Sequence, residues 1–92
     1  MEQAEAIAAL AGLAQVTRVQ LYRLLLAQGP TGMSAGNIAE RLGVAPSSLS
    51  FHLTQLVQAG LITQTRSGRQ LIYAARPATI EALRGYLADM TG

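Results

Sequence analysis

The sequence predicts a mainly α-helical domain that carries one small β-hairpin. Its length of 92 residues suits a single domain, so residues 1–92 form one unit. Helix start and stop residues recur along the chain, and one β-favouring stretch is divided by Ser67-Gly68. Together these two observations predict five helices and one hairpin.

Two helices are predicted before residue 30. A helix over about residues 2–13 is indicated by an apolar stripe along one side, made of Ile7, Leu10 and Leu13. The second helix has a start signal in Thr17, because Gln20 follows three residues later as a capping box requires. Gly29, followed by a proline, ends this helix.

The next two helices predict a helix-turn-helix over residues 34–59. Ser34 is an N-cap for the third helix and Gly43 ends it, while Pro46 suits the first position of the fourth. Only residues 43–45 connect the two helices, and a short turn that contains glycine lets two helices cross steeply. An ordinary pair of packed helices would tolerate the same turn.

The hairpin predicts a wing over residues 61–75. Leu61–Arg66 and Arg69–Ala75 favour β-structure, and Ser67-Gly68 is a two-residue turn between them. Because an isolated hairpin is unstable in water, it must lie against the helices. Helix, turn, helix and hairpin in this order, with arginines on both sides of the tip, predict a winged helix-turn-helix.

The last helix is expected over residues 77–90, with an apolar stripe made of Ile80, Leu83, Leu87 and Met90. A domain of this size gains from a partner subunit, because it buries only about two thirds of the surface that its unfolded chain exposes. We therefore expect a homodimer built from the first and last helices, residues 1–13 and 77–90. The expected interface residues are Ile7, Leu10, Leu13, Ile80, Leu83 and Leu87.

Composition excludes several classes of protein. Half of the residues are hydrophobic, but no uncharged apolar run approaches the length of about 20 residues that spans a bilayer. The N-terminus carries Glu2 and Glu5 where a secretory signal is basic, so a cytoplasmic location is expected. With no cysteine, disulfides and thiolate metal sites are excluded. No enzyme is expected, because the chain has neither a nucleophile–base constellation nor a phosphate loop.

The charge is unevenly distributed along the chain. The formal net charge is +2, and all seven cations are arginines. From Leu42 to Arg76 the sequence contains three arginines and no acidic residue. Such an asymmetry favours contact with a polyanion. The same three arginines would also suit an ordinary solvated face.

The candidate DNA-binding residues lie on the fourth helix and on the wing. The side of this helix opposite its leucines is polar and uncharged, and hydroxyl and amide groups contact phosphates and base edges. Its N-terminal serines are expected deepest in the major groove, with the wing arginines at minor-groove phosphates. The full set is Ser47, Ser48, Ser50, Phe51, His52, Gln55, Arg66 and Arg69.

Two residues of this set differ from the rest. Phe51 stands among polar positions, where it would contact a thymine methyl group or fold back over a neighbouring helix as a core residue. His52, the only histidine, is a candidate partner for a phosphate or for a local hydrogen bond. A lone histidine without cysteines or nearby acidic residues makes a poor metal site, so we predict neither a metal nor a cofactor.

With these residues in place, the sequence resembles the ArsR/SmtB family of bacterial metalloregulatory repressors. The matching segments span roughly residues 13–75 and read VTRVQLYRLLLAQGP, SAGNIAERLGVAPSSLSFHLTQLVQAGLI and TQTRSGRQLIYAA. The form SSLSFHL is similar to an arsenic-responsive branch. The resemblance implies a five-helix winged fold, a dimer through the first and last helices, and repression of an operon with release by an inducer. A two-fold symmetric dimer predicts an inverted-repeat operator in duplex DNA.

The inducer does not follow from the resemblance. Family inducers are commonly metal or metalloid ions held by Cys, or by His and acidic residues on the last helix. Here that helix ends in LADMTG and carries Glu81 and Asp89 but no His. Three explanations stay open: the thiols lie in a removed tail, they have been substituted, or the effector is not a thiophilic metal.

The sequence leaves open the operator sequence and the regulated genes. It also leaves a competing function, that of a winged-helix module for protein interaction or dimerisation without operator binding. Salt-sensitive binding to duplex DNA separates the two, because a module that binds only protein has no counterions to release from phosphates.

Overall fold

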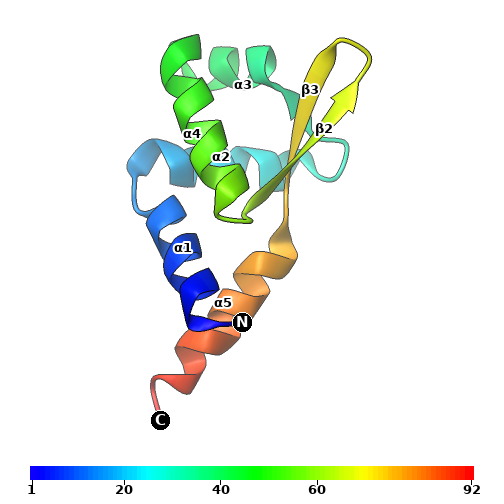
Figure 1. The fold of residues 1–92 in the computed structure, drawn as a ribbon. Helices are drawn as coiled ribbons and strands as arrows, with labels where there is room; N and C mark the ends of the chain where they lie inside the picture. The colour runs from blue at the N-terminus through cyan, green and yellow to red at the C-terminus, as the bar shows by residue number, and fades with distance from the viewer.

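The computed structural model describes all 92 residues and contains five helices and a three-stranded sheet (Figure 1). The elements follow in the order α1 (Gln3–Leu13), α2 (Val16–Gln28), β1 (Met33–Ser34), α3 (Ala35–Leu42), α4 (Pro46–Gln58), β2 (Ile62–Ser67), β3 (Gln70–Ala75) and α5 (Pro77–Asp89). The molecule is elongated, with principal extents of 46, 23 and 21 Å. In Figure 1, α2, α3, α4 and the sheet form the upper part, and α1 and α5 extend below it. The predicted winged helix-turn-helix is confirmed.

The first helix packs through its small residues. Ala6, Ala9 and Gly12 face the interior, whereas the larger side chains of Ile7 and Leu10 point outward. Residues spaced three apart share one side of a helix, so the small-residue stripe lets α1 approach its neighbours closely. The predicted apolar stripe is therefore largely left on the surface.

The predicted start signal of the second helix is wrong. Gln15, and not Thr17, is the N-cap, and its Oε1 accepts a hydrogen bond of 2.9 Å from the backbone N–H of Arg18. Only Ala14 and Gln15 separate α1 from α2, so the chain has to re-enter a helix at once. Gln15 has an extended backbone and a side chain long enough to reach the third N–H of the helix.

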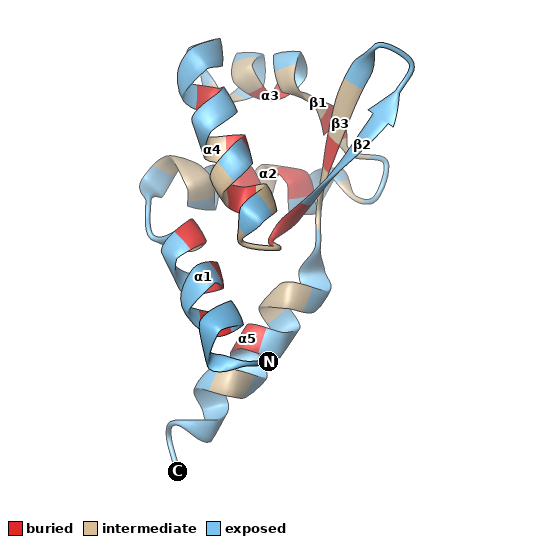
Figure 2. Ribbon diagram, viewed as in Figure 1, coloured by how far each residue is buried: buried red, intermediate tan, exposed pale blue.

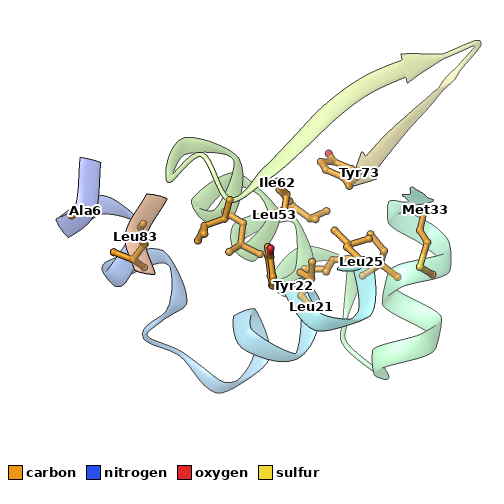
Figure 3. Packing of buried hydrophobic residues seen from close by; sticks show 14 residues of the cluster. Ala6, Leu21, Tyr22, Leu25, Met33, Leu53, Ile62, Tyr73 and Leu83 are labelled. Atoms are coloured by element: carbon orange, nitrogen blue, oxygen red, sulfur yellow. The ribbon is translucent and has the colours of Figure 1, made fainter. Parts of the chain in front are cut away.

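The helix-turn-helix is built as predicted. Ser34 caps α3 by accepting a hydrogen bond of 3.3 Å from Asn37, and Pro46 occupies the first position of α4. The core lies between these two helices, α2 and the sheet (Figure 3), and its large, fully buried side chains come from α2, α3 and α4 and from the segment that leads into β2. The largest of them are Leu21, Leu25, Ile38, Leu49, Leu56 and Leu61.

The wing belongs to an antiparallel sheet with the order β1-β3-β2. The short strand β1 was not predicted, and it pairs Met33 with Tyr73. The predicted turn is displaced by one residue, because Ser67 pairs with Gln70 and the loop is therefore Gly68-Arg69. Gly68 has a φ of 62°, and only glycines have a positive φ in this chain, so the loop follows the Gly-first pattern of a type II′ turn. This places Arg69 at the tip.

The last helix packs mainly on α1. Leu83 of α5 is only 5% exposed and belongs to the core, and the Thr79 hydroxyl donates to the Gly60 carbonyl oxygen near the start of the helix. The remainder of α5 leaves the body of the molecule (Figure 1). None of the helices combines the length and the hydropathy needed to cross a membrane.

Candidate DNA-binding surface

The fourth helix separates its apolar and polar residues onto two sides. Leu49, Leu53 and Leu56 are buried, and the opposite side is open to solvent along the helix (Figure 2). The exposed residues include Ser47, Ser48, Ser50 and Phe51, while His52 and Gln55 are half-buried. The whole helix, PSSLSFHLTQLVQ, carries no Asp, Glu, Lys or Arg. This surface can donate and accept hydrogen bonds without placing a fixed charge against a base edge.

The N-terminus of α4 is open. Its N-cap is Ala45, which has no side-chain oxygen, and Pro46 follows it. The first-turn N–H groups of Ser47 and Ser48 therefore have no cap side chain to which they can donate a hydrogen bond. No acidic residue stands in this turn, so the positive end of the helix dipole is not neutralised. Such an end favours a phosphate group.

Phe51 is a surface residue. Its side chain is 58% exposed, and its ring meets the His52 ring edge-on with 6.0 Å between the ring centroids. Of the two alternatives that the sequence left open, the core position is excluded. The ring is free to contact a partner molecule.

His52 faces another element of the fold. Its Nδ1 lies 3.4 Å from Nη1 of Arg18 in α2. Burial lowers the pKa of His52, and the nearby charge of Arg18 lowers it further. The imidazole is therefore held toward its neutral form.

The wing carries cations without acidic partners. Arg66 lies in β2 opposite Leu71, Arg69 lies in the loop, and both are exposed. The one ion pair of the chain, Arg84 with Glu81 at 3.3 Å, lies on α5. Figure 1 places the wing tip and the N-terminal half of α4 at the same end of the molecule. That end combines an uncharged polar helix with two free guanidinium groups.

The expected dimer residues differ in how far one chain already buries them, and they fall into three groups. Ile7, Leu10 and Leu87 are 57%, 42% and 39% exposed, so they offer apolar surface. Leu13 and Ile80 are half-buried against the core. Leu83 is only 5% exposed in one chain, where it belongs to the same core cluster as Ala6 and Ala9 of α1. Its position on the predicted stripe could not distinguish the chain's own α1 from a second subunit.

Arg18 contacts the candidate site residue His52, and it was not singled out from the sequence. It lies on α2, outside the helix-turn-helix and the wing, and 34 residues separate it from its neighbour His52. Nothing in its local pattern distinguishes it from any other helix-surface arginine.

No group of three or more His, Asp or Glu residues comes together anywhere in the chain.

Known proteins of similar sequence or fold are transcription regulators. Residues 13–65 match the family model described as a helix-turn-helix domain. The HTH-type transcriptional regulator YgaV of Escherichia coli (strain K12) is 27% identical over 71 residues, which cover 77% of this chain and 72% of YgaV. The ArsR-like transcriptional regulator from Rhodococcus sp. RHA1 is 28% identical with a TM-score of 0.85, over 96% of this chain and 80% of that one.

A further solved structure is the homodimeric winged helix-turn-helix DNA-binding domain Mb0332 (fragment 1–100) from Mycobacterium bovis, a possible ArsR-family transcriptional regulator. It is 27% identical with a TM-score of 0.75, over 92% of this chain and 79% of that one. The helix-turn-helix model covers more than half of the chain, and the matching structures extend over the wing and the flanking helices as well. The chain therefore belongs to the ArsR family of winged helix-turn-helix, DNA-binding transcription regulators.

Proposed function

We propose that this protein is a homodimeric repressor that binds an inverted-repeat operator and leaves it when an inducer binds. The observation that carries the proposal is the exposed, uncharged polar side of α4 at the same end of the molecule as Arg66 and Arg69. A helix of this kind fits a major groove, and unpaired arginines on a hairpin suit the phosphates beside it.

The two parts of this surface have different roles in the proposal. Ser47, Ser48, Ser50 and Gln55 read base edges, and the open N-terminus of α4 contacts a phosphate. Phe51 contacts a thymine methyl group, which is an apolar form of base recognition. The wing arginines fix the position of the protein on the duplex and contribute little to sequence preference.

The dimer is supported by the outward side chains of α1 and α5. Ile7, Leu10 and Leu87 are exposed on the two helices that extend away from the DNA-binding end (Figure 2). A large apolar group costs free energy when it stays in water, and a symmetric partner would cover it. The related Mycobacterium bovis domain is homodimeric. Met90, which is also exposed, extends this apolar surface beyond the end of α5.

The inducer is proposed to be something other than a thiol-bound metal. The chain has no cysteine and one histidine, and that histidine stands on the recognition helix α4. Metalloids such as arsenite prefer polarizable thiolates, which this chain does not supply.

Footprinting of the DNA upstream of the gene, followed by fluorescence anisotropy at several salt concentrations, tests the proposal. We expect protection of an inverted repeat and an affinity that falls linearly on a log–log plot against salt. Binding that is absent, or that does not change with salt, would instead favour a module that contacts only protein. A matched duplex of scrambled sequence serves as the control for sequence preference.

A further inference from the structure

A bridge of hydrogen bonds joins α1 to the recognition helix through Arg18. Its Nε donates to the Gly12 carbonyl oxygen at 2.7 Å, and its Nη1 lies 3.4 Å from Nδ1 of His52. The backbone N–H of the same residue is held by the Gln15 side chain. The guanidinium is thus fixed between the end of α1 and the middle of α4.

At the Gly12 end of the bridge, Arg18 supplies a hydrogen-bond donor that α1 itself lacks. Gly12 stands in the last turn of α1, where carbonyl oxygens have no partner within the helix. No backbone N–H bonds to its oxygen, so the Arg18 side chain satisfies it. A cation at this point also meets the negative end of the helix dipole. These interactions fix the arginine from the α1 side.

At the other end of the bridge, the guanidinium of Arg18 determines which ring nitrogen of His52 carries the proton. Arginine stays protonated and has no acceptor atom, so a ring nitrogen that faces it has to accept. His52 then carries its proton on Nε2, which points to the opposite side of the ring from Arg18. Four elements pack against α4, namely α1, α2, α3 and β2. Among their charged groups, Arg18 is the one whose charge lowers the pKa of His52.

We propose that Arg18 is a positioning residue for DNA recognition, which holds His52 as a neutral imidazole with its Nε2–H free to donate to DNA. This inference rests on the proposed function, because it takes α4 as the helix that enters the groove. A neutral donor matches the remainder of this helix, which carries hydroxyls and amides and no charged side chain. A protonated ring would bring a second cation against Arg18 and would lose its acceptor nitrogen.

The link between the two residues is tested without DNA. His52 is the only histidine, so long-range ¹H–¹⁵N NMR reports its tautomer and its pKa without assignment ambiguity. We expect the Nε2–H tautomer in the wild-type protein and a pKa below the ordinary value for histidine. In Arg18→Gln the pKa should rise toward that ordinary value and the tautomers should mix. Arg23→Gln, which changes an exposed arginine on the same helix, should leave both unchanged.

Two results would overturn the link. One is the Nδ1–H tautomer in the wild-type protein, a measurement that requires no variant and therefore survives a failure of Arg18→Gln to fold. The other is a folded Arg18→Gln protein whose His52 pKa equals that of the wild type. Thermal unfolding of each variant establishes that it is folded.

The role in recognition is tested by a double-mutant cycle on the operator identified by footprinting. Arg18→Gln should weaken binding by about 3- to 10-fold, the range of one net hydrogen bond. In a His52→Ala background the same change should cost no more than about twofold, because the residue through which it acts is gone. Equal losses in both backgrounds would overturn the proposal, since Arg18 would then act on DNA or on the fold by itself. A wild-type protein that binds no duplex would overturn the proposed function, and the NMR result would still decide the link.

Discussion

Gly12 of α1 lies directly against Ala59 at the C-terminal end of the recognition helix. A Cβ atom on residue 12 would stand 2.8 Å from the Cβ of Ala59 and 3.0 Å from Cδ1 of Leu61. The backbone at the end of α4 fixes the Cβ of Ala59, and the side chain of Leu61 is fully buried. The absence of a side chain at residue 12 therefore sets how closely the first helix approaches the DNA-binding part of the molecule.

Gly12→Ala should destabilise the protein by about 1–3 kcal/mol, because an added methyl group in a tight contact forces the helices apart. Urea unfolding followed by circular dichroism measures the free energy of unfolding. Gly85→Ala is the matched control, since Gly85 lies within α5 and a Cβ there meets nothing within 4 Å. That control should gain about 0.5–1 kcal/mol from the better helix propensity of alanine. Equal effects of the two changes would show that the contact at Gly12 is not tight.

The wing arginines should act on all DNA sequences alike. Arg66→Ala and Arg69→Ala each remove an unpaired cation, so each should weaken binding to operator and scrambled DNA by the same factor. The slope of log affinity against log salt should fall by about 0.9 for each phosphate that is no longer neutralised. Arg23→Ala, which removes an exposed arginine from α2, should leave the slope unchanged. A change in sequence preference in either wing variant would assign base reading to the wing.

The polar side of α4 should carry the sequence preference. Ser48→Ala and Gln55→Ala each remove a side-chain group that reads a base edge. Each should narrow the difference in binding free energy between operator and scrambled DNA by about 1–3 kcal/mol. Gln58→Ala, at the other end of the same helix, is the control and should leave that difference unchanged. Competition binding with the two duplexes measures the difference, and unaltered preference in both test variants would show that α4 does not read the bases.

Most of the fold was predictable because helix ends and turns depend on interactions between residues that are close in the sequence. Ser34, Gly43 and Pro46 mark helix ends through their own hydrogen bonds and backbone angles, and the structure confirms the helix-turn-helix that they define. Strand β1 has no such signal, since two residues form a strand only by pairing with β3. The turn at Gly68 was placed one residue early, although the Gly-first pattern of a type II′ turn favours the observed loop.

The candidate site was less predictable for a different reason. Periodicity shows which residues share one side of a helix, but not what that side meets. Leu83 and Leu87 belong to the same predicted stripe, yet one is buried against α1 and the other is exposed. The contact of Arg18 with His52 depends on the packing of α2 on α4, which no local pattern in either segment describes.

The dimer is best tested at a residue that the core of one chain does not use. Ile7→Asp places a charge on an exposed position of α1, so it should leave the subunit folded and dissociate the dimer, as measured by sedimentation. Leu83→Asp should instead unfold the chain, because it buries an unpaired carboxylate between α1 and α5. A wild-type protein that sediments as a monomer at micromolar concentration would contradict the dimer. If folded Ile7→Asp protein still forms a dimer, the dimer interface does not include this side of α1.

Arsenite and zinc should leave the protein–DNA complex intact. The only sulfur atoms are the thioethers of Met1, Met33 and Met90, which are neutral and lie far apart in the sequence. Zinc requires about four nitrogen, sulfur or carboxylate ligands at a structural site. The single imidazole of the chain stands on α4 and faces Arg18 of α2. We therefore expect that neither ion in excess over protein changes the fluorescence anisotropy of a labelled operator complex. The same titration on a version with two cysteines added at the end of α5 is the comparison. If arsenite releases the 92-residue chain from DNA, a site without thiols senses the metalloid. If arsenite releases only the cysteine-bearing version, a metalloid bound at the end of α5 can weaken DNA binding, and the 92-residue chain lacks the thiols to bind it there.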